Sequence, residues 1–127
     1  MPLNKEVIAQ WTEALRSGEY LQARGTLRKV PLDPDLPTRY CCWGVLCDLY
    51  AKTDEFARWK DGGIFIAGHG HGSIGHGMPP KEVYAWLGLQ ESNFDDGFEL
   101  LASQNDKGIR FTAIADEIDE IAAGEVE

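Results

Sequence analysis

The longest apolar run in the chain covers residues 40–51 and contains all three cysteines. It is too short to cross a bilayer, which takes about 20 residues, and too long for a typical strand of about 5–6 residues. At helical spacing, one face collects Cys42, Val45, Leu46 and Leu49, and Asp48 is the only charge in the run. The pattern therefore predicts a buried central helix over about residues 41–52.

Helical periodicity also appears on both sides of this run. Residues 4–17 have an apolar face, with Asn4 placed to cap the N-terminus and Gly18 placed to end the helix. The other predicted helices cover about residues 80–88, 93–102 and 112–124, the last capped by Thr112. The sequence thus predicts four to five helices, with a turn at 105–108 between the last two.

The remaining segments have strand or loop character. Residues 56–59 and 64–66 have strand composition, and a glycine-rich loop with three histidines follows at 68–77. Residues 19–30 predict a turn and a short extended segment, and three prolines exclude regular structure over 31–38. Together these features predict one α+β domain over residues 1–127, with a small antiparallel β-hairpin at about 56–78.

Charge is distributed unevenly in this acidic chain. The net charge of the chain is −9. Residues 1–40 have a net charge of +1, and residues 41–127 have a net charge of −10. Such a chain is repelled by nucleic acid backbones, which argues against general nucleic acid binding. The basic residues of the first third leave room for a local anion site, because arginine suits bidentate phosphate contacts.

The cysteine pattern and the absence of a long apolar segment bear on localisation. The number of cysteines is odd, and two are adjacent in a helix expected to be buried, so we expect reduced thiols. We see no signal peptide in the opening residues and no membrane-spanning segment. These features favour a cytoplasmic protein without membrane contact.

Three segments, taken in order, resemble a family of small proteins found in tailed phages and prophages. They contain Gln22, Arg24, Gly25, Leu27 and Arg28; then Cys41, Cys42, Gly44, Val45, Leu46, Cys47, Asp48 and Leu49; then Asn105, Asp106, Gly108, Phe111, Ile114, Ala115 and Asp116. The resemblance covers most of the chain but not the loop at 68–77. It carries no settled activity. It implies an accessory protein in the host bacterial cytoplasm that acts by binding, including on host defences.

The candidate site suggested by the residues themselves is an anion or nucleotide site. Guanidinium groups and aromatic faces suit a phosphorylated, base-containing ligand, and the glycine-rich loop can add donors. The predicted ligand-binding residues are Tyr20, Arg24, Arg28, Arg39, Tyr40, His69 and His71. Combined with the setting that the resemblance implies, these residues make sequestration of a nucleotide-like defence signal the favoured function, with no cofactor. The arginines could instead pair with Asp33, Asp35 or the acidic final helix.

Two other functions are left open by the sequence, together with self-association. The acidic C-terminal half could bind a host protein as an inhibitor. Cys42 at a helix N-terminus could instead serve a papain-like hydrolase, with His69, His71 or His76 as its base. The histidines and cysteines contain suitable atoms for zinc, but their spacing is poor, so no metal is expected.

Overall fold

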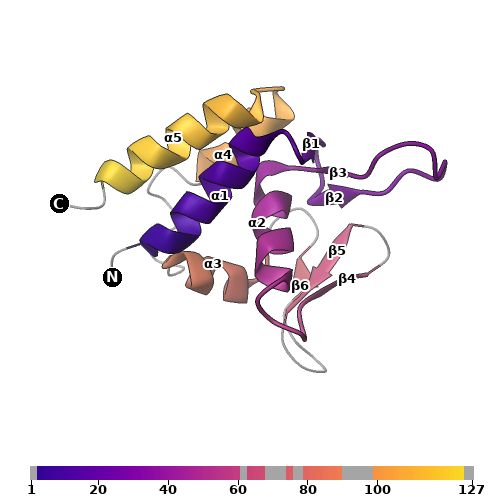
Figure 1. Ribbon diagram of the computed structural model, residues 1–127, viewed down its shortest axis with the longest axis horizontal. Coiled ribbons are helices and arrows are strands. Elements are labelled where there is room, and N and C mark those ends of the chain that lie inside the picture. Colours follow the sequence, from indigo (N-terminus) through magenta and orange to yellow (C-terminus); the bar gives the residue numbers. More distant parts are fainter. Residues whose placement is uncertain (1–2, 61–62, 68–73, 76–78, 90–98, 125–127) are drawn as a thin grey trace.

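The computed structural model describes residues 3–60, 63–67, 74–75, 79–89 and 99–124 (Figure 1). Its helices are α1 (Lys5–Ser17), α2 (Cys42–Ala51), α3 (Lys81–Leu87), α4 (Glu99–Asp106) and α5 (Phe111–Gly124). Its strands are β1 (Leu21–Gln22), β2 (Arg28–Lys29), β3 (Arg39–Tyr40), β4 (Arg58–Lys60), β5 (Ile64–Ile66) and β6 (Ile74–Gly75). The predicted α+β class with helices around a central one is confirmed.

The apolar run forms α2, and its first six residues are all buried. Cys41 precedes the helix as N-cap, with its Sγ accepting from the backbone N–H of Gly44 at 3.3 Å. Gly44 is required here because a Cβ at this position would collide with the carbonyl oxygen of Leu27. The backbone before β2 can therefore lie directly against the first turn of α2, and Leu27 is itself fully buried.

Helix α1 packs against both α2 and α5 (Figure 1). Asn4 caps α1 as predicted, since its Oδ1 accepts from the N–H groups of Glu6 and Val7. The fully buried Trp11 donates its indole Nε1–H to the carbonyl of Cys42 at 2.9 Å. This bond gives the buried indole nitrogen a partner and fixes α1 against the start of α2.

Two small sheets lie beside α2 (Figure 1). In the first, the order is β1-β3-β2, with β1 parallel and β2 antiparallel to β3. In the second, β4, β5 and β6 are antiparallel, which confirms the predicted hairpin. The first strand of that hairpin begins at Arg58 rather than Phe56, because a turn centred on Asp54 holds the N–H groups of Phe56 and Ala57.

The C-terminal helices differ from expectation at the turn between them. The predicted start of α4 near residue 93 lies outside the described residues. Helix α4 continues through Asn105 and Asp106, which were predicted to belong to the turn at 105–108. In the structure the turn begins two residues later than predicted and ends at Gly108, with φ +90°. Helix α5 begins at Phe111, one residue before Thr112. Over the described residues, no helix has both the length and the apolar character needed to cross a membrane.

Asn105 is completely buried and connects three segments. Its Nδ2 donates to the carbonyl of Ala23 at 2.6 Å. Its Oδ1 accepts from Gln22 Nε2 at 2.9 Å and from the backbone N–H of Cys42 at 3.2 Å. The neighbouring Asp106 accepts from the backbone N–H of Gly25 at 2.7 Å. The end of α4 thereby binds both the β1 segment and the N-terminus of α2.

Replacing Asn105 should therefore destabilise the whole fold. Asn105→Ala leaves the buried carbonyl of Ala23 and the N–H of Cys42 without partners, which should lower the free energy of unfolding by about 2–4 kcal/mol. Urea denaturation measures this loss. Ser103→Ala, at an exposed position of the same helix, is the control and should stay within about 0.5 kcal/mol of wild type. Equal stability of the two variants would contradict the assignment.

Candidate functional site

An aromatic group with one carboxylate and one guanidinium lies beside α2. It consists of Tyr20, Arg28, Tyr40, Asp48 and Trp59, here called the aromatic–Asp48 cluster. Tyr20 directly precedes β1, Arg28 begins β2, Tyr40 ends β3, and Trp59 is the central residue of β4. Both sheets and the central helix therefore contribute to one site.

The rings of the cluster form a chain of edge-to-face contacts. The centroids of Tyr20 and Tyr40 are 5.1 Å apart with planes at 85°, and those of Tyr40 and Trp59 are 6.0 Å apart at 64°. Trp59 also packs on Phe65, its partner in the β4–β5 register, at 4.9 Å. These separations lie within the range in which aromatic pairs attract one another. The fully buried Phe65 thus anchors this partly exposed aromatic surface to the core.

Asp48 is the acceptor at the centre of the cluster. Its Oδ2 accepts from the hydroxyl of Tyr20 at 2.6 Å, and its Oδ1 accepts from Trp59 Nε1 at 3.1 Å. The Tyr20 pKa is raised well above its ordinary value, first by burial and then by the hydrogen bond to Asp48 and the charge of that residue. The phenol therefore remains a neutral donor to the carboxylate across the physiological range.

Two cations accompany the aromatic rings. The guanidinium carbon of Arg28 lies 4.6 Å from the centroid of Trp59, within the cation–π range. Lys52 Nζ lies 3.4 Å from the hydroxyl oxygen of Tyr20 and 5.9 Å from its ring centroid. Burial and the charge of Asp48 raise the pKa of Tyr40, and its hydrogen bond with Arg28 partly opposes that shift. The site thus combines aromatic faces with cationic donors.

The structure brings together only some of the predicted ligand-binding residues. Tyr20, Arg28 and Tyr40 meet in the cluster. Arg24 lies instead at the α4–α5 turn, where a Cβ at Gly108 would be 2.5 Å from its Nη2.

Arg39 also lies apart from the cluster, although Tyr40 follows it directly. Successive side chains of a strand point to opposite faces. The β2–β3 register pairs Arg39 with Lys29 and Tyr40 with Arg28, so Arg39 shares the other face with Lys29. The predicted three-arginine site is therefore reduced to Arg28. His69, His71 and His76 lie outside the described residues.

Asp48, Trp59 and Lys52 were not among the predicted site residues. Asp48 had a usable signal, since it is a lone carboxylate in an otherwise apolar run and a buried carboxylate needs donors. Trp59 carried no such signal, because its position follows from the β4–β5 pairing. Lys52 follows the last residue of the central helix, and nothing in the sequence distinguishes it from other exposed lysines.

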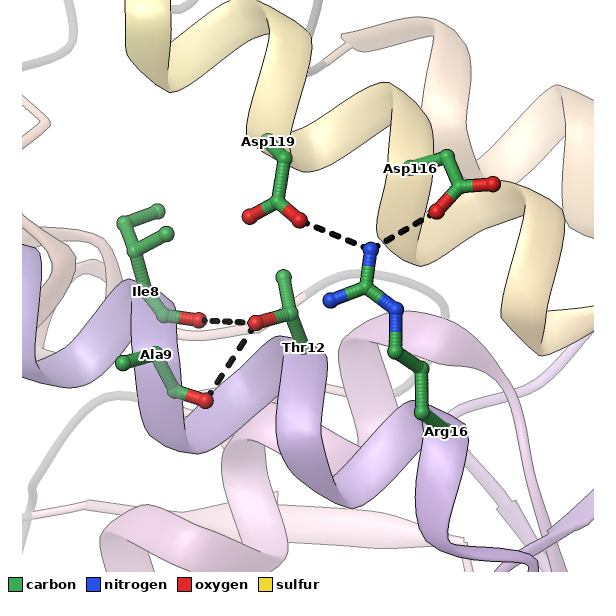
Figure 2. A network of polar contacts seen from close by, with 6 residues as sticks. All are labelled: Ile8, Ala9, Thr12, Arg16, Asp116 and Asp119. Carbon is green, nitrogen blue, oxygen red and sulfur yellow. Dashed lines mark hydrogen bonds and ion pairs between the residues drawn. The ribbon is translucent and has the colours of Figure 1, made fainter.

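The acidic final helix is held by Arg16, on α1 (Figure 2). Its Nη2 lies 2.7 Å from both Asp116 Oδ1 and Asp119 Oδ2. We expected Arg24, Arg28 or Arg39 as a possible partner of this helix, and Arg16 occupies that role instead. Because both groups of the bridge are exposed, its contribution to stability is small. The contact offsets part of the negative charge on which the inhibitor hypothesis depends.

All three thiols are buried, which disagrees with a cysteine nucleophile. Burial raises the pKa of Cys41 to about 11, and it raises the pKa values of Cys42 and Cys47 well above the ordinary value. Cys42 is fully buried, with its Sγ 3.6 Å from the carbonyl oxygen of Leu101. Desolvation therefore outweighs the expected lowering of the pKa by the helix dipole. The hydrolase interpretation of Cys42 is not supported by this geometry.

Metal ligands are not grouped in the part of the chain that the structure describes. No three His, Cys, Asp or Glu side chains there lie together in an arrangement able to hold a metal ion. The cysteines, which contain the softest donor atoms, are free thiols packed in the core.

One family comparison covers nearly the whole chain. The family described as Domain of unknown function (DUF8296) matches residues 3–122. The chain belongs to this family. Neither curated proteins nor solved structures give a significant match. The DUF8296 match includes every residue of the aromatic–Asp48 cluster. It also includes Asn105 and the residues that it bonds, Gln22, Ala23 and Cys42, here called the Asn105 junction.

Tyrosine titration provides a test of this environment in the DUF8296 chain. All four tyrosines have raised pKa values, each chiefly because of burial. The folded protein should therefore show little phenolate absorbance at pH about 10, where about half of the tyrosines of the unfolded chain are ionised. The tyrosine contribution to stability is complete below pH about 10 and is lost as pH rises toward the folded-state pKa values. Coincident titration curves for folded and urea-unfolded protein would contradict these assignments.

Thiol reactivity tests the burial of the cysteines. A water-soluble aromatic disulfide reagent should label none of the three thiols at pH 7 in the folded protein, because they are buried and protonated. All three should react in urea. Rapid labelling of Cys42 in folded protein, as monitored by peptide mass spectrometry, would revive the nucleophile interpretation. Cys42→Ser protein serves as the control for assigning that peptide.

Proposed function

We propose that the protein acts by binding a phosphorylated, nucleotide-like small molecule at the aromatic–Asp48 cluster. The observation that carries this proposal is the stacking of Arg28 on Trp59 beside the rings of Tyr20 and Tyr40. A guanidinium group binds phosphate in a bidentate manner, and aromatic faces accept a base by stacking. The cluster offers both kinds of group on one surface.

The charges of the cluster are consistent with an anionic ligand. Arg28 and Lys52 contribute two positive charges, and Asp48 contributes one negative charge that Tyr20 and Trp59 already engage. The carboxylate holds the two rings in place and presents little free acceptor capacity to a phosphate. Lys52, which is exposed, is able to move toward a ligand because its contact with Tyr20 is long.

Capture without chemical conversion is the simplest role for these groups. Tyr20 and Tyr40 are neutral at pH 7, because a phenol ordinarily ionises at pH about 10 and burial raises both pKa values further. Neither acts as a nucleophile in that form. The resemblance to phage accessory proteins supplies the biological setting. In that setting the protein sequesters a host defence signal in the bacterial cytoplasm and thereby acts as a counter-defence protein.

Calorimetry against a panel of mono-, di- and cyclic nucleotides tests the proposal. Arg28→Ala should weaken the binding of a positive ligand by about ten- to hundredfold, as expected for loss of a charge-assisted hydrogen bond. Arg28→Lys should recover only part of the affinity, because lysine lacks the planar bidentate fork. Trp59→Leu should weaken binding by removing the stacking surface.

Arg39→Ala is the matched control, since Arg39 lies on the neighbouring strand but on the opposite sheet face. It should leave affinity within about twofold of wild type. Equal losses in the Arg28 and Arg39 variants would indicate a nonspecific electrostatic effect. Absence of binding across the panel, or unchanged affinity in Arg28→Ala, would refute the proposed site.

A further inference from the structure

The aromatic–Asp48 cluster has a cation on each side of its central tyrosine. Strand β3 lies between β1 and β2, and Tyr40 on β3 is paired with Arg28 on β2. Tyr20, which directly precedes β1, lies on the other side of Tyr40 and is the residue that Lys52 contacts. Neighbouring strands are about 4.8 Å apart, so β1 and β2 are about 10 Å apart. Arg28 and Lys52 therefore approach the aromatic surface from opposite flanks.

The Arg28 flank has the donors needed to hold one phosphate group. Arg28 lies over Trp59, with 4.6 Å between its guanidinium carbon and the ring centroid, and it donates to the hydroxyl oxygen of Tyr40. A guanidinium group has five N–H donors, and a hydroxyl that accepts a hydrogen bond keeps its own hydrogen as a donor. The other guanidinium N–H groups and the Tyr40 hydroxyl can therefore donate together to the oxygens of a phosphate.

The Lys52 flank provides a second, separate cation. Lys52 is the exposed C-cap residue of α2, one turn after Asp48. Its ammonium group has three donors, and the 3.4 Å contact with the hydroxyl oxygen of Tyr20 engages one of them. The hydroxyl hydrogen of Tyr20 is already donated to Asp48 at 2.6 Å. A phosphate on this flank would therefore be held by Lys52, as a point charge on a flexible stem.

Aromatic rings separate the two flanks. The centroids of Tyr20 and Tyr40 are 5.1 Å apart. The two phosphorus atoms of a diphosphate are closer together than this, because they share one bridging oxygen, so contiguous phosphates do not match both flanks. Phosphates on different sugar hydroxyls, or on two linked nucleosides, are farther apart. They leave a base or a sugar between them to cover the rings.

We infer that the ligand of the cluster carries two phosphate groups at separate positions, one held by Arg28 and Tyr40 and the other by Lys52. Two kinds of nucleotide share this chemistry. Nucleoside bisphosphates are phosphorylated on two sugar hydroxyls, and cyclic dinucleotides have two phosphodiesters that join two nucleosides. Mononucleotides with a single phosphate or with contiguous phosphates lack it. This inference rests on the proposed function, to which it adds a ligand class and a role for Lys52.

Calorimetry at about 0.15 M salt tests the ligand class with adenosine monophosphate, adenosine diphosphate, adenosine 3′,5′-bisphosphate and cyclic di-adenosine monophosphate. Parallel guanosine, cytidine and uridine series cover the choice of base. The bisphosphate or the cyclic dinucleotide should bind about tenfold or more tightly than the mono- and diphosphate of the same base. Whichever of them binds more tightly identifies the source of the two phosphates. The cyclic dinucleotide carries less negative charge than the diphosphate, so its tighter binding could not result from net charge.

Two lysine variants test the second phosphate contact. Lys52→Ala should weaken binding of the ligand with separated phosphates by about tenfold, and binding of the monophosphate by no more than about twofold. Lys60→Ala is the matched control, because Lys60 is exposed on β4 and follows Trp59 directly, so that it lies on the opposite face of the strand. This control should leave both affinities within about twofold of wild type. Circular dichroism should show an intact fold for both variants.

The results distinguish this inference from the proposed function. If the monophosphate binds as tightly as the ligands with separated phosphates and Arg28→Ala weakens it, the two-phosphate inference is overturned and the proposed function stands. Unchanged affinity in Lys52→Ala, or equal losses in the Lys52 and Lys60 variants, would also overturn the inference. Absence of binding by every nucleotide would overturn both.

Discussion

The buried amide of Asn105 is the interaction on which the rest of the structure depends. It satisfies backbone groups of two segments that are distant in sequence, the carbonyl of Ala23 and the N–H of Cys42. A backbone group buried without a partner costs about as much free energy as a lost hydrogen bond. The joint burial of the β1 segment and the start of α2 therefore depends on the end of α4.

The position of the candidate site follows from this junction. The junction holds the segment before β2, and the missing side chain of Gly44 lets Leu27 lie against α2. These contacts also determine where Arg28 and Tyr40 lie. Arg28 directly follows Leu27 and is paired with Tyr40 across β2 and β3, beside α2. The segments around residues 22–28, 41–49 and 105–116 thus assemble this part of the fold. Several of their residues serve packing, and Arg28 and Asp48 also belong to the site.

Local signals were enough to predict most helices, and tertiary effects explain the failures. The Asn4 cap and the apolar run were correctly interpreted because each depends on neighbours within one or two turns. The arginine site was only partly predicted, because a two-residue strand places Arg39 and Tyr40 on opposite faces. The alternative of a reactive Cys42 left open by the sequence is not favoured by the structure, since the thiol is fully buried and lies against Leu101. Neither effect can be recognised from residue spacing.

The single charge on the central helix has a further consequence for folding specificity. A helix that is apolar on nearly every side has several rotational settings of similar hydrophobic energy. Only the observed setting directs Asp48 toward the hydroxyl of Tyr20 and the indole N–H of Trp59. A rotation that kept Asp48 partly buried but moved it away from these donors would leave the carboxylate without partners, which is costly. Asp48 thereby acts together with the Gly44–Leu27 contact to select one packing of α2.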